Sequence, residues 1–63
     1  MPLTLKQARV INEISQHKMA EMLGIHVDTY RKIEREPDMA TIEQARKISK
    51  ITGVPVEQIF FAQ

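Results

Sequence analysis

The stretch QHKMAEMLGIHVDTYRKIER, residues 16–35, decides the fold of this chain. Its apolar side chains form two stripes at helical spacing, the first made of Met19, Ala20 and Leu23 and the second of Tyr30 and Ile33. Gly24 lies between the stripes, where a glycine can adopt a positive φ just past a helix end without a steric clash. The pattern predicts two short helices, over residues 16–23 and about 27–35, joined by a tight bend.

The second of these helices carries a polar and partly basic face. Its polar residues and those just before it are His26, Asp28, Thr29, Arg31, Lys32 and Arg35. Ala20 has the smallest side chain on the first stripe, so another helix can approach closely there. Two helices that cross at a small residue, the second with an outward polar face, are typical of a helix-turn-helix, which places its second helix in the major groove of DNA.

The length and composition of the chain restrict its class. Its 63 residues allow one domain, 1–63, and the hydrophobic content of 43% with 27% charged residues indicates a folded domain. The absence of cysteine excludes disulfides and thiolate zinc sites and fits a reducing cytosol. The sequence has no apolar run long enough to span a membrane, and residues 1–10 lack the apolar core of a signal peptide.

The net charge is only +1, whereas a strongly basic balance is usual for proteins that bind DNA. Any electrostatic attraction to DNA must therefore come from where the charges lie rather than from their total.

Capping signals give the boundaries of five expected helices, and no strand alternation is present. The expected helices cover residues 5–13, 16–23, 27–35, 42–52 and 56–61. Thr4 and Thr41 each begin a capping box, and Ser15 is a good N-cap, whereas His26 is a poor one. Pro37 stops the third helix because the residue before a proline avoids helical backbone angles. The sequence therefore predicts an all-α fold, a compact five-helix bundle with the helix-turn-helix over residues 16–35.

Most of the apolar residues are expected to form one core. The expected core residues are Leu5, Ala8, Ile14, Met19, Ala20, Leu23, Ile33, Met39, Ile42, Ala45, Ile48, Val56, Ile59 and Phe60. Tyr30 can pack its ring there while its hydroxyl reaches a polar partner or a phosphate. Val10, Ile11, Met22 and Phe61 do not fit this set, and so many exposed apolar residues on a small domain indicate a partner surface.

The joint pattern of these motifs resembles the lambda-repressor/Cro-like helix-turn-helix family. The segments that carry the resemblance are ISQ (14–16), MAExLGI (19–25), DTY (28–30) and IER (33–35). Downstream segments match the family's fourth and fifth helices, namely PDM (37–39), ARKI (45–48) and GVPVEQIF (53–60). The resemblance covers nearly the whole chain and is closest to the small stand-alone regulators of phages and prophages.

The resemblance implies a partner and a location. Its members are five-helix bundles that bind double-stranded operator DNA, usually as homodimers, so the implied location is the bacterial cytosol or nucleoid. The family often dimerises through its last helix and C-terminal segment, which makes Phe61 the expected dimer contact. No cofactor, metal or membrane is implied.

The resemblance also implies which residues read the bases. These are Val27, Asp28, Arg31 and Lys32, at the start of the second helix of the motif and one turn further on. Lys32 can donate to guanine O6 and N7, Asp28 can accept from cytosine N4, and Val27 can contact a thymine methyl. Two alternatives stay open: Asp28 in a first helical turn is also favoured by capping and the helix dipole, and Arg31 can bind a phosphate.

A second group is expected to contact the phosphate backbone. It consists of Gln16, His17, His26 and Thr29. Gln16 begins a helix, where its amide and the free backbone N–H groups can bind a phosphate, but it can also be a solvent-exposed capping residue. His17 is equally well explained as a surface histidine, and it has no second ligand at metal spacing.

Arg9 and Glu34 are an expected structural pair. The family commonly has a partly buried ion pair at these positions, and such a pair would fix the angle of the recognition helix. This chain departs from the family after Glu34-Arg35, where Glu36-Pro37 stands in place of the usual Gly-Lys and is followed by Asp38. Phosphate binding is therefore not assigned to residues 36–38.

Two functions compete, and neither is enzymatic. The first is a sequence-specific transcriptional regulator, a repressor that acts by occupying an operator. The second is a protein-interaction module with the same fold, such as an antitoxin subunit or a modulator of another regulator. The near-neutral net charge and the acidic loop at residues 36–38 favour it slightly. The sequence lacks a cysteine nucleophile, a glycine-rich phosphate loop and paired catalytic carboxylates, so we expect no enzyme. The start at Met1 with a complete first cap favours a natural N-terminus, but a domain of a longer repressor remains open.

Overall fold

The structure, a computed structural model, describes residues 3–61 without the side chain of Phe61. Its elements are α1 (Leu5–Ile11), α2 (Gln16–Leu23), α3 (Val27–Arg35), the 3₁₀ turn η1 (Pro37–Met39), α4 (Ile42–Thr52) and the π-helical turn η2 (Glu57–Phe61). The described residues form no strand, and the predicted all-α fold with five helices is confirmed. The turn η1 was not predicted.

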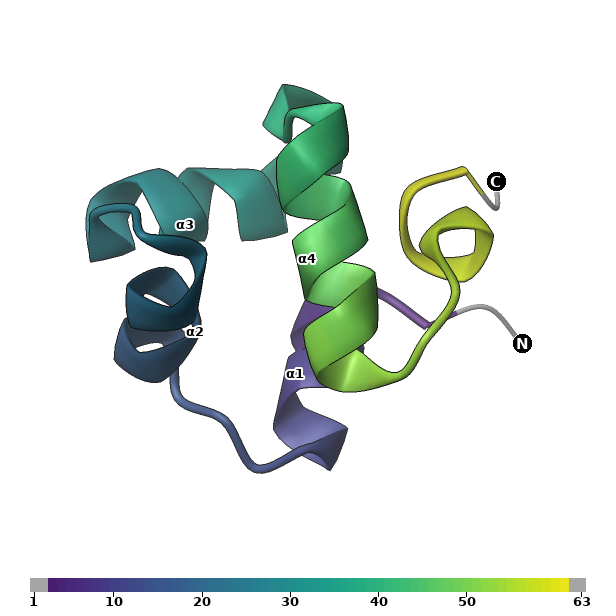
Figure 1. Cartoon of the computed structure of the whole chain (residues 1–63), viewed down its shortest axis with the longest axis horizontal. Helices are drawn as coiled ribbons and strands as arrows, with labels where there is room; N and C mark the ends of the chain where they lie inside the picture. The colour runs from purple at the N-terminus through teal and green to yellow at the C-terminus, as the bar shows by residue number, and fades with distance from the viewer. Residues whose placement is uncertain (1–2, 62–63) are drawn as a thin grey trace.

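The helices α2 and α3 form one end of the molecule (Figure 1). They make the most extensive contact of any two elements. In the same view, α4 runs through the middle with α1 behind it, and η2 lies on the far side from α2. Asn12, just after α1, links α1 to the end of α4, because its side-chain nitrogen donates to the carbonyls of Ala8 at 2.8 Å and Thr52 at 3.0 Å. The helix-turn-helix unit is thus held at one end of a small scaffold.

Polar side chains cap the helices at their N-termini. Thr4 and Thr41 each accept from a backbone N–H three residues on. The side-chain oxygen of the glutamine at that position accepts from the backbone N–H of the threonine, which completes both capping boxes. Ser15 Oγ accepts from the Lys18 backbone nitrogen at 3.0 Å. The expectation that His26 caps poorly is wrong, since its Nδ1 accepts from the backbone nitrogen of Asp28 at 3.1 Å and occupies one free donor of α3.

The bend between α2 and α3 is a Schellman motif around Gly24. Gly24 has a φ of +71°, and its nitrogen donates to the Glu21 carbonyl at 3.1 Å. The nitrogen of Ile25 donates back to the Ala20 carbonyl at 3.0 Å, and Ile25 packs against the core. These bonds terminate α2 and set the direction in which α3 begins.

The end of α1 differs from the sequence prediction. The helix ends at Ile11 rather than Glu13, because Glu13 adopts the left-handed conformation with a φ of +56°. The nitrogens of Glu13 and Ile14 donate to the carbonyls of Val10 and Arg9, which is the same Schellman pattern. Glutamate gives no sequence signal for this conformation, so the helix end was placed too late.

The core prediction is correct for most residues and wrong for two. The buried apolar residues are Leu5, Ala8, Met19, Ala20, Leu23, Tyr30, Ile33, Ala45, Ile48, Ile59 and Phe60. Met39 is 54% exposed and Ile42 is 75% exposed, contrary to expectation. Met39 ends the unpredicted turn η1. Ile42 is the first residue of α4 and lies one turn before the buried Ala45, at the end of the helix that projects past the core. Ile14 and Val56 pack at its edge, half-buried.

Candidate nucleic-acid interface

The helix α3 buries one side and exposes the other. Tyr30 and Ile33 anchor its inner side and are 0% and 2% exposed. Asp28, Arg31 and Lys32 lie on its exposed side. The face that the sequence predicts for a DNA groove is therefore open to solvent and not packed against the protein's own helices.

An open depression of about 670 Å³ lies against this exposed side. It is lined by Lys6 of α1, Gln16 of α2, and Asp28, Arg31, Lys32, Glu34 and Arg35 of α3. Four of these side chains are cationic and two are acidic, and one of the acids is already neutralised by Arg9. The weak net charge of the chain therefore conceals a local excess of positive charge at the helix-turn-helix.

The guanidinium of Arg31 bridges α2 and α3. Its Nε donates to Gln16 Oε1 at 3.2 Å, and its Nη1 donates to Asp28 Oδ1 at 2.9 Å. The side chain of Arg31 nevertheless remains 44% exposed. Asp28 is 69% exposed and lies in the first turn of α3, so the geometry is compatible with both of its expected roles.

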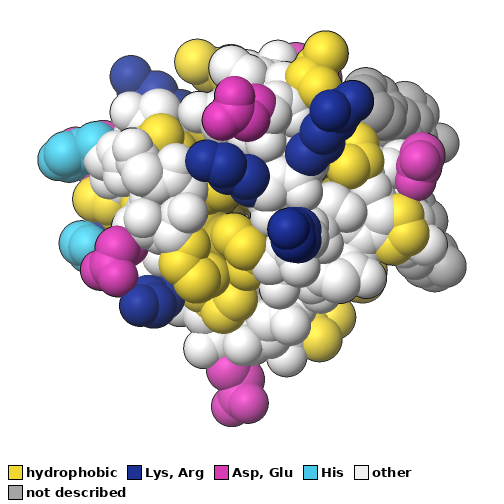
Figure 2. Space-filling model, viewed as in Figure 1, with side chains coloured by type: hydrophobic (Ala, Val, Ile, Leu, Met, Phe, Trp, Pro, Cys, Tyr) yellow, Lys and Arg dark blue, Asp and Glu magenta, His cyan; other side chains and the backbone are white. Residues whose placement is uncertain are grey.

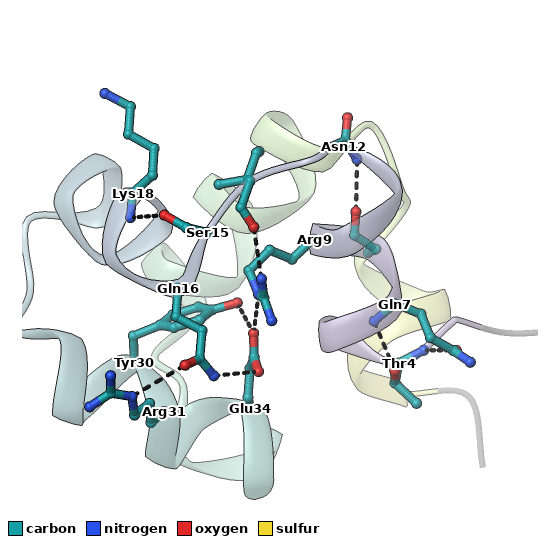
Figure 3. Close-up of polar contacts among 12 residues, drawn as sticks. Thr4, Gln7, Arg9, Asn12, Ser15, Gln16, Lys18, Tyr30, Arg31 and Glu34 are labelled. Atoms are coloured by element: carbon teal, nitrogen blue, oxygen red, sulfur yellow. Dashed lines mark hydrogen bonds and ion pairs between the residues drawn. The ribbon is translucent and has the colours of Figure 1, made fainter.

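A network of buried polar groups connects α1, α2 and α3 (Figure 3). Glu34 Oε2 accepts from Arg9 Nε at 2.5 Å and from the Tyr30 hydroxyl at 2.6 Å, while its Oε1 accepts from Gln16 Nε2 at 3.1 Å. Arg9 also donates from Nη1 to the Ile14 carbonyl at 2.7 Å, in the loop before α2. The side chains of Arg9 and Glu34 are 9% and 7% exposed, so water screens this ion pair little. The pair joins the end of α3 to α1, as the resemblance implied.

The network fixes the protonation states of its members. Burial alone would raise the pKa of the Glu34 carboxyl, but the hydrogen bonds from Arg9, Tyr30 and Gln16 and the Arg9 charge outweigh burial and lower the pKa below its ordinary value of 4.5. Burial acts to lower the pKa of Arg9, and the Glu34 carboxylate raises it overall. Burial and the same carboxylate raise the pKa of Tyr30. Near neutral pH the network is therefore a cation, an anion and a neutral phenol donor.

Four of the predicted DNA contacts lie outside the depression, namely His17, His26, Val27 and Thr29. His17, His26 and Thr29 are exposed near the N-termini of α2 and α3, and Val27 is half-buried against the core. Because Nδ1 of His26 accepts a hydrogen bond, its neutral ring carries the proton on Nε2, which can donate outward. Figure 2 shows both histidines at the left edge, the end of the molecule that α2 and α3 form in Figure 1.

Sequence reasoning missed two basic residues of this surface. Lys6 and Arg35 line the depression but were not assigned a role. A signal for Lys6 existed: it precedes Arg9 by three residues, so both lie on the side of α1 that faces α3. The expected dimer contact, Phe61, has a side chain outside the described part of the structure.

Among residues 3–61, no group of three or more histidine or acidic side chains is placed to hold a metal ion. Within the same range, no helix has the length and apolar character needed to cross a bilayer.

Comparison with known proteins identifies the family. A family model described as Helix-turn-helix matches residues 5–59, which is most of the chain. No curated protein and no solved structure matches. The matched range contains the capping box at Thr41, the glycine bend and the exposed face of α3. The chain therefore belongs to the lambda-repressor/Cro-like helix-turn-helix family of DNA-binding regulators.

Proposed function

We propose that residues 1–63 form a single DNA-binding domain that acts as a sequence-specific regulator, a repressor of the phage or prophage type. In this proposal, α3 enters the major groove of an operator and blocks transcription by occupying it. The observation that carries the proposal is the combination of a solvent-exposed polar side on α3 with four cations around it. The same proposal places the protein in the bacterial cytosol or nucleoid.

The exposed side of α3 supplies side chains that can distinguish base pairs. Lys32 and Arg31 can donate to guanine O6 and N7, and Asp28 can accept from cytosine N4. Val27 begins α3 and is half-buried, so only part of its side chain is available to a thymine methyl. These four residues are the proposed base-reading set.

Phosphate contacts are proposed at the N-termini of α2 and α3. Some backbone N–H groups in these first turns are not bonded by the caps and can donate, and the helix dipoles favour an anion. His17, His26 and Thr29 are exposed at these ends. Lys6 and Arg35 add positive charge on either side of the recognition face, in positions suited to the flanking phosphates.

We propose that the protein binds its operator as a homodimer, as the family usually does. Two copies would then read half-sites about one helical turn, roughly 34 Å, apart. Sedimentation with and without the operator duplex tests this point. The proposal would be contradicted if one copy bound a duplex with a single half-site as tightly as a duplex with two half-sites, and if the second duplex held no second copy.

A salt series on random duplex DNA tests the proposed function against its alternative. We expect affinity to fall steeply between about 0.05 and 0.2 M salt, because each neutralised phosphate releases counterions. The control is the Lys47→Ala variant, which removes one exposed charge from α4 and should leave the slope unchanged. Absent binding, or binding that salt does not weaken, would contradict DNA as the partner.

One observation favours the alternative, a protein-interaction module. Glu36 and Asp38 place acidic charge directly after α3, and the exposed Met39 and Ile42 are adjacent to them in sequence. This combination of acidic and exposed apolar side chains is more typical of a protein-binding surface than of a phosphate-binding one. A failed salt series would make this surface the first place to look for a partner.

A further inference from the structure

The side-chain amide of Gln16 is held on both of its polar atoms. Gln16 begins α2 and is half-buried, and in Figure 3 its amide lies between the Glu34 carboxylate and the Arg31 guanidinium. Its Nε2 donates to Glu34 at 3.1 Å, and its Oε1 accepts from Arg31 at 3.2 Å. These two bonds commit the amide oxygen and one of the two amide N–H donors of Gln16 within the protein.

The two neighbours allow only one orientation of this amide. A carboxylate accepts hydrogen bonds and cannot donate them, so the amide nitrogen must face Glu34. A guanidinium donates and cannot accept, so the amide oxygen must face Arg31. Glu34 is itself fixed by Arg9 and Tyr30, and the orientation of Gln16 is therefore set from the buried side of the domain.

These contacts hold Arg31 in a defined position and leave some of its N–H donors unbonded. Two of its five N–H donors are committed, one to Gln16 and one to Asp28. The remaining donors are sufficient for a bidentate contact with O6 and N7 of a guanine. Because the side chain is already restrained, less rotamer entropy is lost when it binds a base.

We propose that Gln16 is a positioning residue, which holds Arg31 in place for a bidentate contact with guanine. The proposal rests on the proposed function, since a guanine edge is reached only if α3 lies in the major groove. The specificity of the surface is then set in part by Glu34, which touches no DNA.

Selection of bound sites from a random duplex pool tests the proposal. The proteins compared are the wild type, Gln16→Ala, Arg31→Ala and the double variant, with Lys47→Ala as the control. We expect Gln16→Ala and Arg31→Ala to lose preference at the same guanine, each by roughly tenfold or more. The double variant should lose no more of the preference for this guanine than Arg31→Ala alone, because both residues act through the same contact with the base. The control should keep the wild-type preference.

Two outcomes would overturn the proposal and are distinguishable. If Gln16→Ala weakens all sequences alike and reduces the salt slope by about 1, Gln16 is a phosphate contact and the proposed function stands. If the wild type itself selects no sequence, the proposed function fails and the positioning role fails with it.

A measurement on the free protein completes the test. By NMR, the Arg31 Nε–H signal of the wild type should exchange slowly with water, because its hydrogen is bonded to Gln16. Gln16→Met keeps the side-chain volume but removes both polar atoms, so this signal should exchange fast while the protein stays folded. A signal that exchanges equally slowly in Gln16→Met, with its fold intact, would contradict the restraint.

Discussion

Glu34 connects the stability of the domain to its recognition face. Its carboxylate accepts hydrogen bonds from three different elements while its side chain is only 7% exposed. A buried carboxylate left without partners is strongly destabilising, whereas a fully partnered one is tolerated. The three donors from Arg9, Tyr30 and Gln16 therefore explain how a domain this small can bury a charge.

The Tyr30 hydroxyl can be removed without removing the ring. Tyr30→Phe should lower the free energy of unfolding by about 1.5–3 kcal/mol, because it deletes a hydrogen bond to a charged group. The ring, which is fully buried, remains in place. Urea unfolding of the two proteins at neutral pH measures the difference. Equal stability would mean that the hydroxyl contributes nothing to holding Glu34.

The lowered pKa of Glu34 predicts how stability depends on pH. The unfolded chain binds a proton near the ordinary value of 4.5, while the folded chain does so only at lower pH. The stabilisation is therefore fully present above about 4.5 and is lost as pH falls through the folded-state pKa. Urea unfolding between neutral and acidic pH measures this loss.

Matched glutamine variants assign the pH dependence to its source. Glu34→Gln should flatten the acidic loss of stability, whereas Glu43→Gln, at an exposed carboxylate on α4, should retain it. A loss that persists unchanged in Glu34→Gln would place its origin at another carboxylate.

At the scale of elements, the two Schellman motifs use different residues for the same task. Gly24 and Glu13 both have a positive φ at the end of a helix, +71° and +56°. A left-handed residue with a Cβ costs about 1–2 kcal/mol, which glycine avoids. The strain lies at Glu13, in the turn that leads into α2.

Glu13→Gly should therefore stabilise the domain. We expect the free energy of unfolding to rise by about 0.5–1 kcal/mol, the relieved strain less the greater flexibility of glycine when unfolded. Gly24→Ala is the matched reverse change and should lower stability by about 1–2 kcal/mol, since its Cβ would meet no other atoms and only the backbone cost remains. Thermal unfolding compares all three proteins. Destabilisation by Glu13→Gly would contradict this account of the turn.

Local signals explain which elements the sequence could predict. The bounds of α2 and α4 are correct at both ends because a capping hydroxyl begins each and a glycine with positive φ ends each. The end of α1 and the turn η1 carry no such signal, because Glu13 and Met39 take their conformations from their surroundings. The contacts of Gln16 depend on the spacing between α2 and α3, which no local pattern in the sequence contains.

At the scale of the whole molecule, the position of the charges matters more for attraction to DNA than the net charge does. The chain carries a net charge of +1, yet four cations surround the exposed side of α3 while Glu36 and Asp38 lie beyond its end. We expect such an arrangement to attract phosphates to this end of the molecule.

The central claim is that α3 reads bases from the major groove. The most direct measurement compares Kd for the selected duplex with Kd for two analogues at the preferred guanine. One analogue replaces N7 with carbon and alters only the major-groove edge, and the other, inosine, lacks the amino group in the minor groove. We predict that loss of N7 weakens binding by roughly tenfold while inosine binds like guanine. Unchanged binding without N7, together with weakened binding to inosine, would contradict the claim.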